Sequence, residues 1–180
     1  MSPNLPSVLD AEQNYLQLVA QIQPLIQANT CLVGVQSKGV LIAKRMHQEL
    51  ALNNPLGSIS SSMHRDDYKI RGMSKAQSTV LPFEVNGADI LLIDDVLYTG
   101  RTVRAIINEL FDFGRPARIR LAVLVDRNEK QLPITADVSG VCLTQNDRLT
   151  GALTLIQNAA GQFDFEYLSG SPEKPEEVLA

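Results

Sequence analysis

Two adjacent aspartates, Asp94 and Asp95, directly follow an apolar run at residues 90–93 (ILLI). Neighbouring carboxylates repel each other, so a pair at the end of a buried strand requires a cation or several hydrogen-bond donors. Magnesium commonly binds one or two carboxylates together with the phosphate oxygens of a substrate. The pair therefore indicates a site for a divalent cation or for sugar hydroxyl groups, with capping of the next turn as the simpler alternative.

A second candidate site follows at residues 99–102 (TGRT), where a strand pattern changes into a helical one. Free backbone N–H groups at a helix N-terminus, together with the helix dipole, bind phosphate groups. The hydroxyls of Thr99 and Thr102 add hydrogen-bonding groups, and Gly100 lets the backbone approach a ligand closely. An ordinary capped turn between a strand and a helix has a similar composition, so this segment alone is open to both interpretations.

Two further strand ends carry polar residues. Residues 34–39 (GVQSKG) end one apolar run, and Asp126 and Arg127 end another. The first segment lacks the Gly-Lys-Ser/Thr ending of a nucleoside-triphosphatase loop. Its backbone N–H groups, with Lys38 beside them, could still hold a diphosphate. Because ligands of open parallel sheets bind at the carboxyl ends of the strands, we expect all these residues to meet at one edge.

The segments that must position these residues alternate between strand and helix patterns. Apolar runs predict buried strands, and apolar residues at helical spacing predict helices; the strands are expected at 31–35, 90–93 and 119–125, and the helices at 11–26, 40–52 and 103–111. Asp10, followed by Gln13, indicates where the first helix begins, and Pro24 should kink or end it. Strand, helix and strand in this order predict an α/β fold with a mainly parallel sheet.

The second half of the chain completes this picture. A weak strand is expected at 57–63, a further strand at 135–143, and a terminal hairpin at 152–156 and 163–168. Residues 64–87 show no periodicity and are long for a simple connection, which is typical of a functional lid or of disorder.

The last residues differ in composition from the rest. Residues 169–180 contain two prolines and three glutamates, which is typical of a disordered tail. Residues 1–168 are therefore expected to form a single domain, and their number lies within the range of about 100–200 residues that is typical of one domain.

Composition and charge exclude several classes of protein. The chain has 180 residues, is 44% hydrophobic and carries a net charge of −4, which excludes a uniformly basic nucleic-acid-binding protein. No apolar stretch approaches the length of a membrane span, and the N-terminus lacks the pattern of a signal peptide. Cys31 and Cys142 lie in apolar runs and are expected in the core, so no disulfide framework is expected. We therefore expect a soluble, cytoplasmic protein.

The residues around the acid pair resemble a known family. Residues 90–102 (ILLIDDVLYTGRT) resemble the phosphoribosyl-diphosphate motif of type I phosphoribosyltransferases. The form DDVLYTGRTVRA, together with residues 114–116 (GRP) and 121–133 (LAVLVDRNEKQLP), is similar to the pyrimidine operon attenuator and uracil phosphoribosyltransferase family (PyrR). The resemblance implies that family's fold, with a central sheet flanked by helices, a mobile loop and a small C-terminal hood hairpin.

The resemblance also implies a reaction, in which uracil and phosphoribosyl diphosphate give UMP and diphosphate with Mg²⁺. It assigns catalysis to Asp94, Asp95, Arg65 and Lys38, with Arg65 on the mobile loop at 64–68 (HRDDY), and metal binding to Asp94, Asp95 and Asp126. It assigns substrate binding to Ser37, Gly39, Val96, Leu97, Tyr98, Thr99, Gly100, Arg101, Thr102, Asp126 and Arg127.

These roles agree with the chemistry of the residue types. Loss of diphosphate leaves positive character on the ribose and negative charge on the leaving group, which fixed charges and donors can stabilise. Residues 99–102 would hold the 5′-phosphate, the acid pair the ribose, and residues 37–39 the diphosphate. Arg65 would cover the site and exclude water.

The sequence departs from the family where its members bind a messenger-RNA hairpin. Residues 128–131 (NEKQ) stand where a His-Arg pair is usual, Thr135 where an arginine is common, and residues 141–143 (VCL) where a basic turn is usual. No Arg, Lys or His lies between Asp10 and Gln27. Because phosphate contacts dominate affinity for RNA, we expect weak hairpin binding.

Two alternatives remain beside an active uracil phosphoribosyltransferase. One is a regulator of pyrimidine biosynthesis that senses UMP or phosphoribosyl diphosphate with little or no transfer. The other is an enzyme for another base such as hypoxanthine, which the Tyr98 and Arg101 form of the motif disfavours. The resemblance further implies a homodimer or a higher homo-oligomer.

Overall fold

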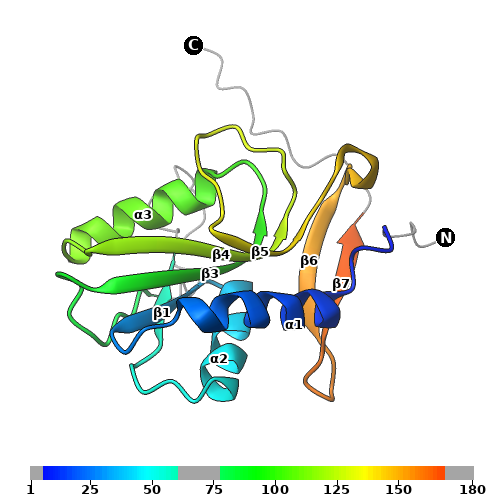
Figure 1. Ribbon diagram of the computed structural model, residues 1–180. Coiled ribbons are helices and arrows are strands. Elements are labelled where there is room, and N and C mark those ends of the chain that lie inside the picture. Colours follow the sequence, from blue (N-terminus) through cyan, green and yellow to red (C-terminus); the bar gives the residue numbers. More distant parts are fainter. Residues whose placement is uncertain (1–5, 61–77, 169–180) are drawn as a thin grey trace, which may run out of the picture.

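Helices and strands alternate along the chain, as the sequence predicts. The computed structural model describes residues 6–60 and 78–168 (Figure 1). The elements are α1 (Ala11–Ile22), η1 (Gln23–Leu25), β1 (Thr30–Val35), α2 (Lys38–Glu49), β2 (Gly57–Ile59), β3 (Asp89–Leu97), α3 (Arg101–Phe113), β4 (Arg118–Asp126), β5 (Val138–Cys142), η4 (Gln145–Asp147), β6 (Ala152–Gln157) and β7 (Phe163–Leu168).

The strands form two separate sheets. A five-stranded sheet has the order β2-β1-β3-β4-β5 with parallel pairing throughout, and β6 and β7 form an antiparallel hairpin. This arrangement confirms the predicted α/β class, the mainly parallel sheet and the C-terminal hairpin.

The first helix begins and ends where its sequence indicates. Asp10 Oδ1 accepts a hydrogen bond from the backbone N–H of Gln13 at 2.9 Å and so caps the N-terminus of α1. Tyr15, Leu18 and Ile22 are fully buried on one face of the helix. Pro24 cannot continue the α-helical hydrogen bonds, and the chain passes into the short 3-10 helix η1.

The other two helices differ from their predictions in detail. α2 begins at Lys38, inside the segment expected to be a loop, so that Ser37 lies at its N-terminus. On α3 the predicted apolar face included Phe111, which is 42% exposed. The buried stripe of α3 runs through Val103, Ile106 and Leu110. Phe111 lies about 100° further around the helix than Leu110, so it points out of that stripe.

The central strand β3 continues beyond the acid pair. The sequence predicts this strand at 90–93, but β3 extends to Leu97 and remains paired with β4, with Val96 opposite Val125 and Leu97 opposite Asp126. The acid pair therefore lies on a fixed strand and not in a loop.

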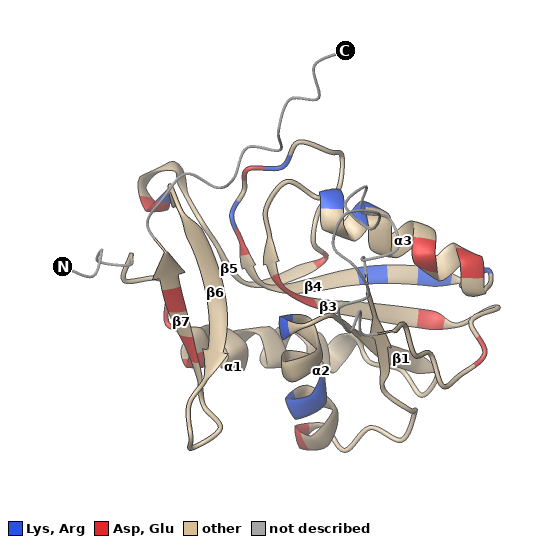
Figure 2. Cartoon of the chain, turned by 180° about the vertical axis from the view of Figure 1, so that it is seen from behind, with Lys and Arg blue, Asp and Glu red and all other residues tan. Residues whose placement is uncertain are grey.

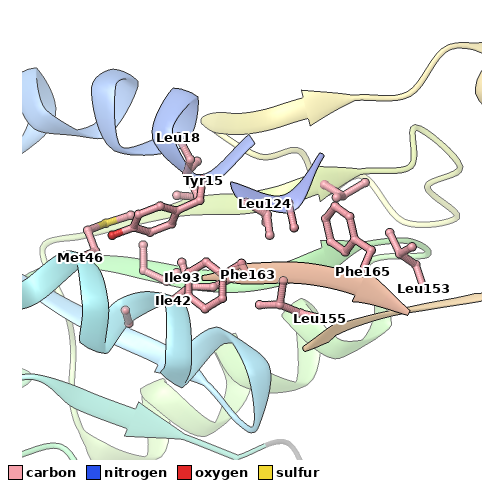
Figure 3. Packing of buried hydrophobic residues seen from close by; sticks show 14 of the residues in the cluster. Tyr15, Leu18, Ile42, Met46, Ile93, Leu124, Leu153, Leu155, Phe163 and Phe165 are labelled. Atoms are coloured by element: carbon pink, nitrogen blue, oxygen red, sulfur yellow. The ribbon is translucent and has the colours of Figure 1, made fainter. Parts of the chain in front are cut away.

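Helices cover both faces of the large sheet, with α1 and α2 on one face and α3 on the other (Figure 1). The residues of the larger core cluster come from α1, α2, one face of the sheet and the hairpin, and those of the smaller cluster come from α3 and the opposite face. Figure 3 shows the larger cluster, where the labelled side chains include Tyr15, Leu18, Ile42, Met46, Leu155 and Phe163.

Side chains attach the hairpin to the two helices on this face. Glu12 of α1 accepts a hydrogen bond from the backbone N–H of Phe163 at 2.9 Å. Arg45 of α2 forms an ion pair with Glu12, and its guanidinium lies 4.2 Å from the Tyr15 ring centroid and 5.1 Å from that of Phe163. The hydrogen bond from Arg45 holds the pKa of Glu12 below its ordinary value.

The two cysteines lie in different environments. Cys31 is buried in β1, as expected, but Cys142 is exposed, and its assignment to the core was wrong. Cys142 is the last residue of β5, which pairs only with β4 and forms an edge of the sheet, so an apolar run there does not imply burial on both faces.

Within residues 6–60 and 78–168, no helix is long and apolar enough to cross a membrane.

Candidate active site

Three parallel strands bring the predicted site residues to one edge of the sheet. β1, β3 and β4 are neighbours, and their carboxyl ends lead to Ser37, to Asp94 and Asp95, and to Asp126. The convergence expected from the sequence is therefore present in the fold, and the chemistry of this edge depends on how the individual side chains lie.

Gly39 places the loop after β1 against the acid pair. A Cβ atom at this position would lie 2.2 Å from the carbonyl oxygen of Ile93 and 3.0 Å from the Cα atom of Asp94. Gly34 permits a second close approach, since a Cβ atom there would lie 2.5 Å from the Cα atom of Val40. These two glycines allow the first turn of α2, with Lys38, to lie directly beside β3.

The acid pair occupies an environment that favours a bound positive charge. Asp94 is buried and Asp95 is half-buried. Burial raises the pKa of both carboxyl groups, and the charge of Asp95 raises the pKa of Asp94 further. The positive charge of Lys38 has the opposite effect on the pKa of Asp95. A cation or a positively charged sugar ring at this position would relieve the repulsion within the pair.

Backbone donors fix the orientation of the two carboxylates. Asp94 Oδ1 accepts from the N–H of Asp95 at 2.9 Å, and Asp95 Oδ1 accepts from the N–H of Val96 at 3.0 Å. Each carboxylate keeps further oxygen lone pairs that can accept hydrogen bonds or bind a metal.

The segment 99–102 forms the turn that leads from β3 into α3. Gly100 has a φ of 88° and is the N-terminal cap of the helix, in a left-handed conformation that favours glycine. Thr99 Oγ1 accepts from the backbone N–H of Arg101 at 3.3 Å. The first turn of α3 therefore presents backbone N–H groups at the positive end of the helix dipole, as a phosphate site requires.

Asp126 lies at the same edge but is already paired. Its carboxylate accepts from Lys130 Nζ at 2.9 Å and from the backbone N–H of Asn128 at 2.7 Å. In the described ranges, no cluster of three or more His, Cys, Asp or Glu side chains is arranged to hold a metal ion. The residues present therefore suit a magnesium ion that is bound partly by the protein, through one or two carboxylates, and partly by the oxygens of a substrate. This is how Mg²⁺ usually binds.

Arg127 is buried, and its side chain joins the sheet edge to the hairpin. The guanidinium donates to the backbone carbonyls of Leu149 and Gly151, and it contacts Glu129 at 3.3 Å. It also lies 4.1 Å from the centroid of the Tyr98 ring. Its Nε atom is buried and has no hydrogen-bond partner among the described residues.

The remaining predicted residues contribute in different ways. Leu97 is buried in the core, so only its backbone is available, and its carbonyl accepts from the N–H of Arg127 at 2.9 Å. Val96 is half-buried against the larger core cluster. Arg65, with its loop at 64–68, and the predicted tail at 169–180 lie outside the described residues.

A cavity of about 540 Å³ opens beside the loop after β1. It is lined by Gln36, Ser37, Lys38, Val40, Leu41, Ser58, Ser78 and Val80. The polar groups of this lining suit an anion next to Lys38, in agreement with a diphosphate subsite.

One charged residue of the site, Lys130, is not indicated by the sequence pattern. Lys130, which pairs with Asp126, stands four positions after it. A lysine four positions after Asp126 can reach it only if the chain turns immediately after β4, and the sequence pattern does not indicate such a turn.

Comparison with known proteins agrees with this geometry. The sequence profile described as "Phosphoribosyl transferase domain" matches residues 8–152. The chain is 50% identical over 137 residues to a protein named "Bifunctional protein PyrR" from Ralstonia nicotianae, covering 73% of this chain and 78% of that protein. It is 40% identical over 140 residues to a protein of the same name from Listeria monocytogenes, covering 72% and 76%.

Solved structures share the fold at low sequence identity. A hypoxanthine-guanine phosphoribosyltransferase from Bacillus anthracis superimposes with a TM-score of 0.61 at 16% identity, covering 81% of this chain and 86% of the other. The enzyme of this class from Leishmania tarentolae, solved in complex with GMP, gives a TM-score of 0.59 at 14% identity, covering 81% and 84%.

Proposed function

Because the chain belongs to the type I phosphoribosyltransferases of the PyrR family, we propose that it transfers the phosphoribosyl group of phosphoribosyl diphosphate to uracil. The bond between ribose C1 and a diphosphate oxygen breaks, a uracil ring nitrogen bonds to C1, and the N–H proton leaves to solvent. The products are UMP and diphosphate. The observation that carries the proposal is the acid pair on β3, which lies between the loop of Gly39 and the N-terminus of α3.

Each part of the substrate has a matching group at this edge. The first turn of α3 binds the 5′-phosphate, and Lys38 with the adjoining cavity binds the diphosphate. Asp94 and Asp95 accept hydrogen bonds from the ribose hydroxyls and stabilise the positive charge that develops on the ring. A magnesium ion held by these carboxylates and the diphosphate would neutralise charge on the leaving group.

The base lies at the end of β4, beside Tyr98 and Arg127. The choice of uracil over a purine rests on the resemblance of the sequence to the uracil phosphoribosyltransferases of the PyrR family, to which the relatives belong. The two solved purine enzymes named above are only 14–16% identical and share the fold alone.

The test is transfer of labelled uracil to UMP with phosphoribosyl diphosphate and Mg²⁺, with hypoxanthine, guanine and orotate alongside. We expect turnover with uracil alone. Turnover with a purine instead would overturn the choice of base. Binding of UMP without turnover of any base would support the alternative function, a regulator that senses nucleotides.

We further propose that this chain binds RNA hairpins weakly. α1 carries no Lys or Arg (Figure 2). Of the basic side chains after β4, Lys130 pairs with Asp126, and Arg127 and Arg148 both contact Glu129. Filter binding of an RNA hairpin at two salt concentrations tests this, and tight binding with a steep salt dependence would contradict it.

Sedimentation would show whether the expected homodimer or higher oligomer forms.

A further inference from the structure

The segment that follows β4 lies against the turn expected to bind phosphate. The backbone N–H of Gln131 donates to the carbonyl of Thr99 at 3.0 Å. The Cβ atoms of Leu132 and Ile134 lie 3.5 and 3.4 Å from the position that a Cβ atom would take at Gly100. The phosphate turn is therefore supported from outside by a second segment, distant from it in sequence.

Gln131 also contacts the charged side chain of this turn. Its Oε1 atom accepts a hydrogen bond from Arg101 Nη2 at 3.2 Å. Both residues are exposed, and an exposed arginine side chain loses rotamer freedom when a ligand fixes it. An amide oxygen restricts the guanidinium without neutralising its charge, and it uses one of five N–H donors. The others remain for phosphate oxygens.

We propose that Gln131 is a positioning residue for the 5′-phosphate subsite. Its backbone N–H binds the carbonyl of Thr99, and its side chain orients Arg101 before the ligand binds. This inference rests on the proposed function, because it requires a phosphoribosyl ligand at the N-terminus of α3. It adds a residue outside the phosphoribosyl-diphosphate motif at 90–102, since Gln131 lies in the segment after β4.

Two substitutions separate the hydrogen bond from the packing. Gln131→Met keeps the length of the side chain but removes the amide acceptor, whereas Gln131→Glu keeps an acceptor oxygen at the same reach but adds a negative charge beside Arg101. Gln145→Met, at an exposed position of η4, is the matched control. Calorimetric titration with UMP and with uridine measures the two ligands with and without the phosphate.

We expect Gln131→Met to weaken UMP binding by roughly three- to tenfold, as for the loss of one hydrogen bond, and to leave uridine binding unchanged. Gln145→Met should bind UMP like the wild type, whereas Gln131→Glu should weaken UMP binding, because its carboxylate neutralises Arg101 and repels the phosphate. In an Arg101→Ala background, Gln131→Met should have no further effect on UMP binding. An equal loss for UMP and uridine, or no loss for either, would overturn the proposal.

The same titrations separate this proposal from the proposed function. If the wild-type chain binds neither UMP nor phosphoribosyl diphosphate, the proposed function fails and the role of Gln131 fails with it. If the wild type binds UMP and Gln131→Met binds it equally well, only the role of Gln131 fails.

Discussion

The guanidinium of Arg127 lies 4.1 Å from the centroid of the Tyr98 ring and donates hydrogen bonds to the carbonyls of Leu149 and Gly151. Tyr98 belongs to the motif segment at the end of β3, and the two carbonyls belong to the segment that leads into the C-terminal hairpin. One buried side chain therefore links the sheet edge to the hairpin, and its stacking on Tyr98 fixes the plane in which it donates.

Arg127→Lys should loosen this link. Lysine keeps the charge, but it cannot reproduce the planar, forked geometry by which arginine donates to two carbonyls and stacks on an aromatic ring. We expect a loss of about 1–3 kcal/mol in the free energy of unfolding, since buried carbonyls lose their donors. Faster hydrogen exchange of the backbone amides at 148–153 would locate the change.

Arg148→Lys is the control, because the side chain of Arg148 is 68% exposed and lies 3.5 Å from Glu129. It should leave both stability and exchange close to the wild type. Equal effects of the two substitutions would show that Arg127 does not have the linking role described.

Replacing both acids, Asp94→Asn with Asp95→Asn, should abolish transfer and leave the fold intact. The amides keep the shape of the carboxylates but cannot stabilise positive charge on the ribose. Steady-state turnover with uracil and the circular dichroism spectrum are the measurements. Turnover at the wild-type rate in the double variant would refute the assignment of the site.

The single change Asp94→Asn should stabilise the ligand-free protein. Burial and the neighbouring Asp95 charge raise the pKa of Asp94 above its value of 3.8 in the unfolded chain, so its ionisation at neutral pH opposes folding. We expect a melting temperature higher by roughly 2–4 °C at pH 7.5, which corresponds to about 1 kcal/mol at this size. The difference should shrink as the pH falls and vanish below 3.8, where the carboxyl group is protonated in both the folded and the unfolded state.

Asp89→Asn should be strongly destabilising. Asp89, at the start of β3, is 5% exposed and pairs with the guanidinium of Arg120 at 2.7 Å, which is itself only 9% exposed. Removing the carboxylate leaves a buried positive charge without its partner, at a cost of about 3–5 kcal/mol. Urea unfolding measures it. Arg118→Gln, on the more exposed arginine that also pairs with Asp89, should cost much less.

Stability should fall in acid for the same reason. Burial alone would raise the pKa of Asp89, but hydrogen bonds from Arg118 and Thr30 and the charge of Arg120 outweigh it, and the net shift is downward. Because the pKa of Asp89 is lower in the folded state than in the unfolded chain, the ionised carboxylate stabilises the fold at pH values above the unfolded pKa of 3.8. This stabilisation is lost as the pH falls from 3.8 through the lower pKa of the folded state. Unfolding midpoints between pH 7 and pH 3 should decline less in Asp89→Asn than in the wild type.

Gly39→Ala should displace the loop after β1. The new methyl group would meet backbone atoms of Ile93 and Asp94, which cannot move without disturbing β3. We expect lower stability and weaker binding of phosphoribosyl diphosphate, both measurable by calorimetry. Gly57→Ala is the matched control, because a Cβ atom there would lie 3.0–3.2 Å from side-chain atoms, which can shift more easily than backbone atoms. A larger effect at Gly57 would contradict this explanation.

Much of the fold could be predicted because its signals are local. The caps of α1, the apolar runs of β1 and β4 and the alternation in the hairpin each reflect the surroundings of a few residues. The exposure of Cys142 and Phe111 could not be predicted in this way, because each depends on which neighbours the finished fold supplies. β5 has a strand on one side only, and α3 has the sheet on one face only.

The residues of the site also differ in whether local sequence could predict them. The acid pair and the phosphate turn could be located because they follow single strands directly. The partners of Asp126 and Arg101 could not, since Lys130 and Gln131 reach them only after the chain turns back over the sheet edge. Long-range contacts of this kind leave no periodicity in the sequence.

The hairpin β6–β7 shares no strand pairing with the large sheet in the part of the chain that the structure describes. It is attached through side chains instead, with Glu12 and Arg45 at Phe163 and with Arg127 at Leu149 and Gly151. In evolutionary terms, the turns of the hairpin can vary, while its buried side chains stay packed in the larger core cluster. Substitutions or insertions in its turns leave the hydrogen bonds of the parallel sheet intact, so selection can alter this end of the molecule while the strand edge that carries the acid pair stays unchanged.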